Sequence, residues 1–573
     1  MHKIEIEATC NLAEHLRNQR LPLKMSCGGH GSCRTCRVML DGEPVLACQT
    51  EVQPGEYDIT IPESAASSAN IQIDLSTLEE GLICETPRWK TLSVEVPEAE
   101  TEANASNRQR LEKVLPQGIS LSPHFFDTIS SDAIEGPLTL ACFDSVARFP
   151  IQTKERRSFA IAVDIGTTTL AAALIDLNSR SLIACNGRLN AQYAYSEDLV
   201  ARIAFCHTPE LLEEMRDLGL KHTLIPLVKH LLKEANVSRK DLLATVLSGN
   251  SPMIHILLGL DPTGMGGWPF NGIDYAPPPR PASDHGLPGE HLEFIPSKSA
   301  YLGGDIVSGL ALIDFANAPD GTLFVDLGTN AEIALKAGGK ILCTAVPAGP
   351  SFEGGGFPCG VSAIPGAIDH VWEDDGNLRY STIGDEAAIG LCGSGIISFV
   401  AAAFRARILR KKGRYARRNQ QVEERELVGH LQRVFPITDE VYISEEDINA
   451  FLQAKAAVFS GIITLCKIAE LDLADLDKLY LAGNFGKRVR TADLMDIGII
   501  PPIPADKIEA CGNTSLKGAI YSTLDQQALS RMQDLITKLE FIELNAQATF
   551  QDDFINALFI PHLKLDFGLS KEA

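Results

Sequence analysis

The sequence has no long hydrophobic run and no sign of a secretory leader. No stretch of its 573 residues reaches the roughly 18 consecutive apolar residues that a membrane span requires. Its start, MHKIEIEATC, contains no basic region followed by an apolar one, as a signal peptide would. We therefore expect a cytoplasmic protein with no membrane partner, and the chain length predicts about two to four domains.

Clustered positive charge is also scarce. The net charge is −23, whereas a nucleic-acid partner requires grouped Lys and Arg side chains, so we expect no such partner. One basic run is the exception. It can be a solvated helix and loop face, which is the commoner case, or a docking patch for an acidic partner. The run comprises Arg405, Arg407, Arg410, Lys411, Lys412, Arg414, Arg417 and Arg418.

A P-loop and a disulfide framework are absent too. The motif G-x-x-x-x-G-K-[ST] does not occur, which excludes a P-loop. The chain has 14 cysteines, but thiols in a cytosolic protein stay reduced. Ten of them are scattered singly and are interpreted as small buried apolar side chains. The other four lie within 22 residues of one another, and only these predict a shared function.

The four clustered cysteines have the spacing C-x5-C-x2-C-x11-C on a Gly-rich loop. Thiolates suit iron-sulfur clusters or zinc. Zinc sites usually contain two C-x2-C pairs, whereas this loop has one pair and is spaced like those of plant and adrenodoxin ferredoxins. We therefore predict a [2Fe-2S] cluster. Its expected ligands are Cys27, Cys33, Cys36 and Cys48.

The residues around this loop fit a small electron-transfer domain. Alternation predicts strands over residues 2–8, 37–40 and 57–61, with a short helix over residues 11–20. This arrangement resembles the β-grasp ferredoxin fold, in which one member of the opening hairpin is missing here. We assign residues 1–79 to this domain.

Two segments farther along the chain repeat one pattern of strand, acidic turn and strand. Residues 159–177 read FAIAVDIGTTTLAAALIDL, and residues 322–335 read TLFVDLGTNAEIAL, with the two turns offset by 162 residues. Such a repeat predicts two related subdomains. The turns consist of Asp164, Ile165, Gly166, Thr167 and Thr168 in the first copy and Asp326, Leu327, Gly328, Thr329 and Asn330 in the second.

The chemistry of these turns suits phosphate binding. A glycine in a tight hairpin lets backbone N–H groups and Thr hydroxyls approach phosphate oxygens. An Asp at the turn supplies a hard oxygen ligand for Mg²⁺, usually through water. Two facing hairpins would hold a triphosphate from both sides. We expect phosphate or Mg²⁺ contacts from Asp164, Gly166, Thr167, Thr168, Asp326, Gly328, Thr329 and Asn330.

Three later segments extend this scheme. Residues 478–486, KLYLAGNFG, predict a strand that enters a turn where Gly483 and Gly486 contact the nucleoside. Ser444 and Asp447 form a capping box that opens an amphipathic helix ending near Leu471. Residues 512–524 offer small side chains where two helices can pack closely.

Together these motifs are similar to those of the superfamily that contains acetate and sugar kinases, heat-shock chaperone ATPases and actin. The resemblance implies an actin-like ATPase domain over residues 156–573, with subdomains at about 156–320 and 321–573. It implies that residues 301–310 and the helix from Leu516 connect the two subdomains. It also implies that Asp305 either positions the attacking water or packs near the hinge.

A ferredoxin domain joined to such an ATPase resembles the reductive activators of corrinoid-dependent methyltransferases. The segments AGPSFEGGGFPCG, PGAIDH and GLCGSGII support this resemblance, as does the tract with Asn190, Gln192 and SEDLVARI, despite a Tyr-rich insertion. Residues 80–155 lie outside it. With their polar run from Pro97, we interpret them as a linker and a small middle domain.

The resemblance implies ATP-dependent reduction of Co(II) to Co(I) in a corrinoid protein or cobalamin-dependent methyltransferase. The implied cofactors are the [2Fe-2S] cluster, ATP and Mg²⁺, and the implied partners include an upstream low-potential electron donor. Plant-type clusters operate near about −400 mV, and for one electron each deficit of about 60 mV is a tenfold equilibrium penalty. ATP hydrolysis would offset that penalty. The motifs are compatible with either a monomer or a homodimer.

Two other functions also fit the motifs. An activator of 2-hydroxyacyl-CoA dehydratases would use Cys359 and Cys392 to bind a second cluster at a dimer interface. Both cysteines lie in Gly-rich loops, which we expect more simply to flank the nucleotide. A small-molecule kinase with an appended electron carrier is the other alternative.

Overall fold

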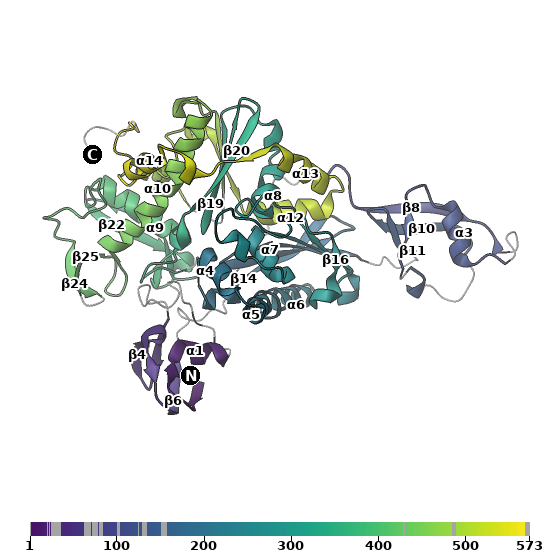
Figure 1. The fold of residues 1–573 in the computed structure, drawn as a ribbon, viewed down its shortest axis with the longest axis horizontal. Coiled ribbons are helices and arrows are strands. Elements are labelled where there is room, and N and C mark those ends of the chain that lie inside the picture. Colours follow the sequence, from purple (N-terminus) through teal and green to yellow (C-terminus); the bar gives the residue numbers. More distant parts are fainter. Residues whose placement is uncertain are drawn as a thin grey trace.

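The computed structural model divides the chain into a two-lobed body and two smaller domains on separate sides of it (Figure 1). The structure describes residues 2–19, 21, 23, 36–61, 70–71, 78, 84–99, 104–123, 125–128, 134–150, 157–196, 198–361, 363–427, 430–483 and 489–567. We refer to residues 2–61 as the N-terminal domain and to residues 84–150 as the 84–150 domain. The body comprises a first lobe (157–318) and a second lobe (319–567).

The N-terminal domain is a small antiparallel sheet with one helix, as the sequence predicts. The strand order is β1-β6-β3-β4, and the turn between β3 and β4 uses Asp41 and Gly42, both with positive φ. β2 pairs with β5 rather than with β1, so among the described residues β1 has only β6 as a neighbour. The elements are β1 (His2–Ile6), β2 (Cys10–Asn11), α1 (Leu12–Asn18), β3 (Arg37–Leu40), β4 (Glu43–Leu46), β5 (Glu51–Val52) and β6 (Gly55–Thr60).

The 84–150 domain is a four-stranded sheet with one helix against it. Its strand order is β8-β10-β11-β9, and Leu111, Phe125 and Leu140 are fully buried between sheet and helix. β8 ends at Val96, just before the polar run from Pro97, and α3 begins with a capping box at Ser106. The elements are β8 (Trp89–Val96), α3 (Asn107–Val114), β9 (Ser120–Leu121), β10 (Gly136–Phe143) and β11 (Val146–Pro150).

The first lobe is built on a mixed sheet in the order β16-β17-β15-β12-β13-β14-β7. The repeat at residues 159–177 forms the antiparallel pair β12 and β13, and β15 lies parallel to β12. The strands are β7 (Asn70–Ile71), β12 (Phe159–Ile165), β13 (Thr169–Asp176), β14 (Ser181–Leu189), β15 (Leu242–Gly249), β16 (Arg280–Pro281) and β17 (His291–Phe294). The helices are α4 (Leu199–Phe205), α5 (Pro209–Gly219), α6 (Ile225–Glu234) and α7 (Ser251–Leu258).

The second lobe repeats the central part of this sheet. Its order is β28-β27-β18-β19-β20-β29, with β18 antiparallel to β19 and parallel to β27. The strands are β18 (Thr322–Leu327), β19 (Asn330–Ala337), β20 (Lys340–Pro347), β27 (Lys478–Ala482), β28 (Ile508–Gly512) and β29 (Leu539–Phe541). The helices are α9 (Gly393–Arg405), α10 (Glu445–Ile468), α11 (Thr491–Ile497), α13 (Ala528–Lys538) and α14 (Phe550–Ala557).

Two small sheets extend this second lobe. One has the order β22-β21-β23, and the other has the order β24-β25-β26. Their strands are β21 (Ala367–Asp374), β22 (Asn377–Thr382), β23 (Gly390–Leu391), β24 (Glu423–Leu427), β25 (His430–Pro436) and β26 (Tyr442–Ser444).

Two helices, α8 (Gly304–Leu312) and α12 (Thr514–Leu524), pack against each other between the lobes. Their contact requires glycine, because a Cβ on Gly518 would lie 2.4 Å from Cβ of Ser308, and one on Gly309 would lie 2.7 Å from Oγ1 of Thr514. The close packing expected from the small residues of 512–524 is therefore confirmed. The lobes meet through α8 and α12 at van der Waals distance.

Helix α10 corrects the expectation that no segment of the chain is long and apolar enough for a membrane span. By length and composition it is apolar enough to cross a membrane, which counting consecutive apolar residues did not detect. However, 83% of its most apolar window is buried inside the protein, as expected of a core helix. Its start matches the predicted capping box, because Ser444 accepts a hydrogen bond from the Asp447 N–H.

Candidate functional site

The two repeated turns face each other across a cavity of about 110 Å³ between the lobes. Thr168 and Thr329 lie on opposite walls, with their Oγ1 atoms 3.1 Å apart. Every predicted nucleotide residue within the described ranges lines this cavity, and Gly486 lies outside those ranges. The lining includes Asp164, Gly166, Thr167, Thr168, Asn250, Asp305, Asp326, Gly328, Thr329, Asn330, Glu332, Gly483, Asn513 and Ser515.

The first turn is fixed from behind by buried polar side chains. Asn190 donates from Nδ2 to the carbonyl of Gly166 (3.1 Å), and Arg202 donates from Nη1 to the carbonyl of Thr167 (2.6 Å). A Cβ on Gly166 would lie 2.4 Å from the carbonyl oxygen of Thr169, so only glycine fits this turn. With its carbonyls held from behind, the turn can direct N–H groups and hydroxyls into the cavity.

Asp164 stands at the end of β12 and is held by α12. Asn513 donates to its Oδ2 (2.9 Å) and Ser515 donates to its Oδ1 (2.7 Å). Burial raises the pKa of Asp164, and these two hydrogen bonds oppose the rise because they stabilise the carboxylate. Among the described residues Asp164 has neutral donors and no ion pair with Lys or Arg, so its charge stays available for a cation.

The second turn is completed by the end of β27. Asp326 pairs with Ala482 in the parallel register of β18 and β27, which brings Gly483 against the turn. Gly483 has a φ of +109°, and a Cβ there would lie 2.5 Å from the carbonyl oxygen of Leu327. The site thus lies at the carboxyl ends of parallel strands, where open α/β sheets bind ligands.

Two further carboxyl groups face the cavity and carry raised pKa values. Burial, with a contribution from the charge of Asp164, raises the pKa of Asp305 to about 7. Burial, Asp305 and Asp326 together raise the pKa of Glu332 well above its usual range. Four carboxyl groups around one small cavity repel each other when ionised, so a bound cation would be stabilised there.

Sequence reasoning missed Asn250, Glu332, Asn513 and Ser515. Glu332 is opposite Asp326 in the β18 and β19 register, so strand alternation after the second turn could have identified it. Asn250 ends the segment LSGN, and LAGN recurs at residues 481–484. Asn250 could have been predicted from this similarity between the two segments. Asn513 and Ser515 are adjacent to Asp164 only through the packing of α12, which no local pattern indicates.

The N-terminal domain brings two predicted cluster ligands together. Cys36 and Cys48 are buried, are not in a disulfide, and have their Sγ atoms 3.3 Å apart. Two thiols at this distance can bind one iron atom, so these residues fit an iron-sulfur cluster. Cys27 and Cys33 lie outside the described residues. Gln49 donates from Nε2 to Sγ of Cys48 at 3.7 Å, within the range for sulfur acceptors.

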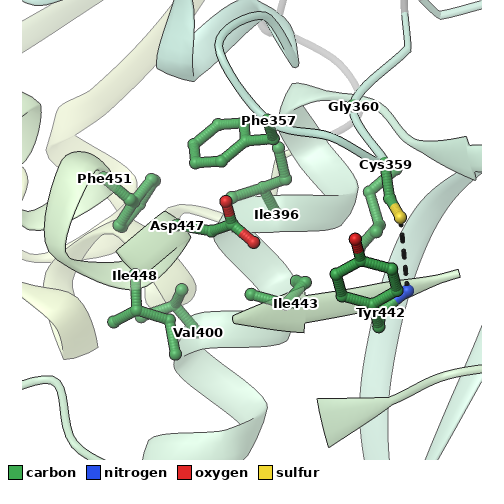
Figure 2. Close-up of a pocket in the computed structure, with 11 residues that line it drawn as sticks. Phe357, Cys359, Gly360, Ile396, Val400, Tyr442, Ile443, Asp447, Ile448 and Phe451 are labelled. Atoms are coloured by element: carbon green, nitrogen blue, oxygen red, sulfur yellow. Dashed lines mark hydrogen bonds between the residues drawn. The ribbon is translucent and has the colours of Figure 1, made fainter. Parts of the chain in front are cut away.

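Cys359 and Cys392 are separate from both sites. Cys359 lines a small apolar pocket with Phe357, Tyr442 and Phe451, and its Sγ accepts a hydrogen bond from the Tyr442 N–H (Figure 2). Burial raises the pKa of the Cys359 thiol, which disfavours the thiolate that binds metal. Cys392 is 2% exposed. Neither cysteine lines the cavity between the lobes, so the described structure does not bring them to the predicted phosphate-binding turns.

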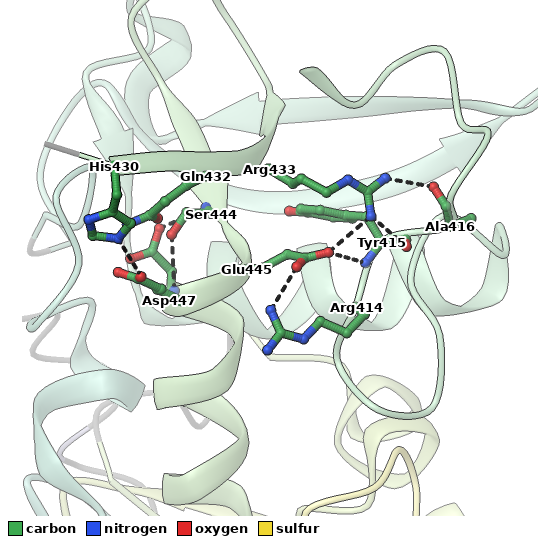
Figure 3. A network of polar contacts seen from close by, with 10 residues as sticks. Arg414, Tyr415, Ala416, His430, Gln432, Arg433, Ser444, Glu445 and Asp447 are labelled. Atoms are coloured by element: carbon green, nitrogen blue, oxygen red, sulfur yellow. Dashed lines mark hydrogen bonds and ion pairs between the residues drawn. The ribbon is translucent and has the colours of Figure 1, made fainter. Parts of the chain in front are cut away.

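The basic run begins at Arg405, the last residue of α9, and two of its arginines form ion pairs with other parts of the second lobe. Arg405 pairs with Asp493 and Asp496, and Arg414 pairs with Glu445, which lies in the polar network of Figure 3. Among the described residues no ion pair is formed by the run's other members, whose side chains are exposed. This supports a solvated face in which two arginines fix the loop. Those other members are Arg407, Arg410, Lys411, Lys412, Arg417 and Arg418.

Comparison with protein families gives three matches along the chain. Residues 2–54 match the model of a 2Fe-2S iron-sulfur cluster binding domain. Residues 159–318 match the RACo middle region, and residues 320–570 match the C-terminal domain of RACo, the ASKHA domain. These three matches do not include the 84–150 domain.

Two of the similar proteins match nearly the whole chain, and a third matches less than half of it. The "Corrinoid activation enzyme RamQ" of Eubacterium limosum is 29% identical over 572 residues, covering 94% of each chain. The "[Co(II) methylated amine-specific corrinoid protein] reductase" of Methanosarcina barkeri is 26% identical, covering 44% of this chain and 48% of that protein. The solved structure "Reductive activator for corrinoid,iron-sulfur protein" is 29% identical with a TM-score of 0.76, covering 100% of this chain and 98% of its own.

Proposed function

Because this chain belongs to the reductive activators of corrinoid-dependent methyltransferases, we propose that its own sites use ATP to deliver single electrons to a corrinoid protein. The reaction is the reduction of an inactive Co(II) corrinoid to Co(I). One observation supports this assignment above the others. A buried thiol pair suited to a cluster and a cavity walled by two phosphate-binding turns are present in one chain.

The N-terminal domain provides the electron-transfer part of this function. A bound [2Fe-2S] cluster supplies one-electron chemistry, and the proposed ligands are Cys27, Cys33, Cys36 and Cys48. Burial of Cys36 and Cys48 limits solvent around that site, and Gln49 places a hydrogen-bond donor at the Cys48 sulfur. Burial and hydrogen bonds to sulfur are two of the main determinants of the potential.

The cavity between the lobes provides the ATP site. Thr167, Thr168, Thr329 and Asn330 donate hydrogen bonds to phosphate oxygens, and Gly483 lies against the nucleoside side. Asp164 and Asp326 would hold Mg²⁺, and the bound ion would neutralise phosphate charge. Asp305, with a pKa of about 7, can accept a proton from the attacking water.

Further features of the proposal follow from the family and from the chain's composition. We assign the chain to the cytoplasm, with a corrinoid protein as the electron acceptor and a separate low-potential protein as the electron donor. We also propose domains at residues 1–79, 80–155 and 156–573, with subdomains at about 156–320 and 321–573.

Iron content and ATP turnover together test this function. We expect about two irons per chain, because a single [2Fe-2S] cluster contains two iron atoms. A second cluster at Cys359 and Cys392 would give about four. We also expect ATP turnover to rise when a Co(II) corrinoid protein is added. A rise with a sugar or acid substrate, with phosphate appearing on it, would instead support the kinase.

The matched control for the cluster uses a cysteine of the same domain. Cys36→Ser and Cys48→Ser should each lose the bound iron and the visible absorbance. Cys10→Ser should keep both, because Cys10 is on β2 and does not belong to the ligand set. Equal iron content in all three variants would contradict the ligand assignment.

A further inference from the structure

Helix α12 connects the ATP cavity with a different part of the chain. At its beginning, Asn513 and Ser515 donate to the two carboxylate oxygens of Asp164. All residues of α12 from Thr514 to Leu524 are buried. With about 1.5 Å of rise per residue, this helix carries any displacement at Asp164 over about 16 Å.

The end of α12 is hydrogen-bonded to residues 84–88, which lead into the 84–150 domain. Asp525, which is 1% exposed, accepts bonds from the N–H groups of Glu85 and Thr86, each at 2.9 Å. The Thr86 hydroxyl donates to the same carboxylate at 2.9 Å. In the backbone, the Arg88 N–H donates to the carbonyl of Leu524. Residues 84–88 are therefore bound to the C-terminal end of α12 through both side-chain and backbone hydrogen bonds.

Arg88 fixes the base of the 84–150 domain to this helix end. Its guanidinium forms paired hydrogen bonds to Asp144, in the turn between β10 and β11, and to Glu293 on β17. It also donates to the carbonyl of Ser522 on α12 at 3.0 Å. One buried cation thus links the 84–150 domain, the first lobe and α12, in the bidentate geometry that Arg favours.

The apolar packing supports the same connection. Trp89, Phe143 and Phe149 from the 84–150 domain belong to one buried cluster with Leu516 and Ile520 of α12. The rest of the domain has its own core and projects away from the body (Figure 1). The base of the domain therefore packs on α12 and is also held to the first lobe, through Arg88 to Glu293 and through Arg148 to Glu290. When α12 shifts relative to the first lobe, the packed base changes position as a unit, because packed elements shift as rigid bodies.

We propose that the 84–150 domain is a nucleotide-linked arm, with Arg88 and Asp525 as positioning residues that join it to α12. The inference rests on the proposed ATP site. Nucleotide and Mg²⁺ at Asp164 change the bonds from Asn513 and Ser515, α12 shifts against α8, and the arm changes position. The arm thereby presents the nucleotide state at a surface remote from the phosphates, where a protein partner can respond to it.

Hydrogen exchange on the full-length, cluster-containing protein tests this inference. Peptides covering residues 84–96 are compared with and without a non-hydrolysable ATP analogue and Mg²⁺, while calorimetry measures binding of the analogue. We expect binding, with exchange in these peptides changing about fivefold or more, a usual size of coupling. Binding without any change at residues 84–96 overturns the inference and leaves the proposed function intact. No binding overturns both.

Variants separate coupling from mere structural support. Asp525→Asn should reduce the nucleotide-dependent exchange change and alter the analogue's affinity by a matching factor, because linkage is reciprocal. Arg88→Met should also reduce the nucleotide-dependent exchange change and alter the analogue's affinity. Arg88→Lys should show smaller effects on both, because it keeps the positive charge. Arg108→Met, at an exposed arginine on α3, is the matched control and should behave as wild type. If folded Asp525→Asn protein keeps the full exchange change, the arm is not coupled through α12.

Discussion

The hydroxyl groups of Thr168 and Thr329 lie 3.1 Å apart, although 161 residues separate them in the chain. Each belongs to one copy of the repeated turn, so the two lobes approach each other at the turns for which we propose phosphate binding. A phosphate chain between the lobes would replace this direct contact with contacts from both turns. We therefore expect occupancy of the cavity to change how closely the two turns approach each other.

Asp326→Asn should reduce ATP turnover by about 100-fold or more, a usual loss when a charge-stabilising group is removed from an active site. The exchange of one oxygen for an amide changes little volume, so the fold should remain. Asp320→Asn, at an exposed position just before β18, is the matched control and should keep wild-type turnover. Equal rates for Asp326→Asn and wild type would show that Asp326 does not act on Mg²⁺.

Asp305 should make the stability of the nucleotide-free protein depend on pH. Its pKa is about 7 in the folded protein and lower when unfolded, so its neutral form is favoured by folding. The stability gained from this group is present at about pH 4 and is lost as pH rises through 7. Asp305→Asn should therefore be more stable than wild type at pH 8, by an amount that shrinks toward pH 4.

Thermal unfolding of both proteins between pH 4 and 8, without Mg²⁺, measures this difference. Asp314→Asn, at an exposed residue beyond α8, should follow wild type throughout. If the gap between Asp305→Asn and wild type stays constant with pH, Asp305 does not titrate in this range.

Burial and the charges of Asp305 and Asp326 raise the pKa of Glu332 well above its usual range, so we expect its hydrogen-bonding group rather than a negative charge to matter for turnover. Glu332→Gln keeps the shape and charge of the protonated form, so ATP turnover should change by less than about threefold. Glu332→Ala removes the hydrogen-bonding group and should lower turnover at least about tenfold more. Steady-state rates of both variants provide the measurement. A Gln variant as inactive as the Ala variant would mean that Glu332 works as a carboxylate.

Gln49→Leu should lower the reduction potential of the cluster. The Nε2 donor near Cys48 stabilises the more negative, reduced state. A net hydrogen bond of about 0.5–1.5 kcal/mol corresponds to roughly 20–60 mV for one electron. Redox titration followed by visible absorbance measures the shift. Gln53→Leu, at an exposed glutamine of the same domain, should leave the potential unchanged. A higher potential in Gln49→Leu would contradict the proposed role of Gln49 as a donor to the Cys48 sulfur.

The local elements were predictable because each depends on neighbours in sequence. The paired strands around Asp164 and Asp326, the capping box at Ser444 and the helix from Leu516 all carry short-range signals of alternation, turn chemistry or capping. The confirmed ferredoxin and actin-like folds follow from such patterns together with the cysteine spacing.

The parts that were not predictable depend on packing between distant segments. Ser515 contacts Asp164 only because glycines let α12 and α8 approach closely, and Arg88 meets Glu293 across 205 residues. Cys359 was expected near the nucleotide from its Gly-rich loop, yet that loop lines an apolar pocket beside α10. Glycine-rich sequence indicates tight backbone, not which cavity the backbone borders.

Anaerobic absorbance spectroscopy of a corrinoid protein mixed with this chain tests the central claim most directly. With a reductant and ATP, the account predicts that the Co(II) band declines and a Co(I) band appears. The band should be absent without ATP, and absent with Cys36→Ser or Asp326→Asn, while Cys10→Ser supports the reaction. Formation of Co(I) at the wild-type rate by Cys36→Ser protein that lacks iron would contradict the account, because the electron would then bypass the cluster.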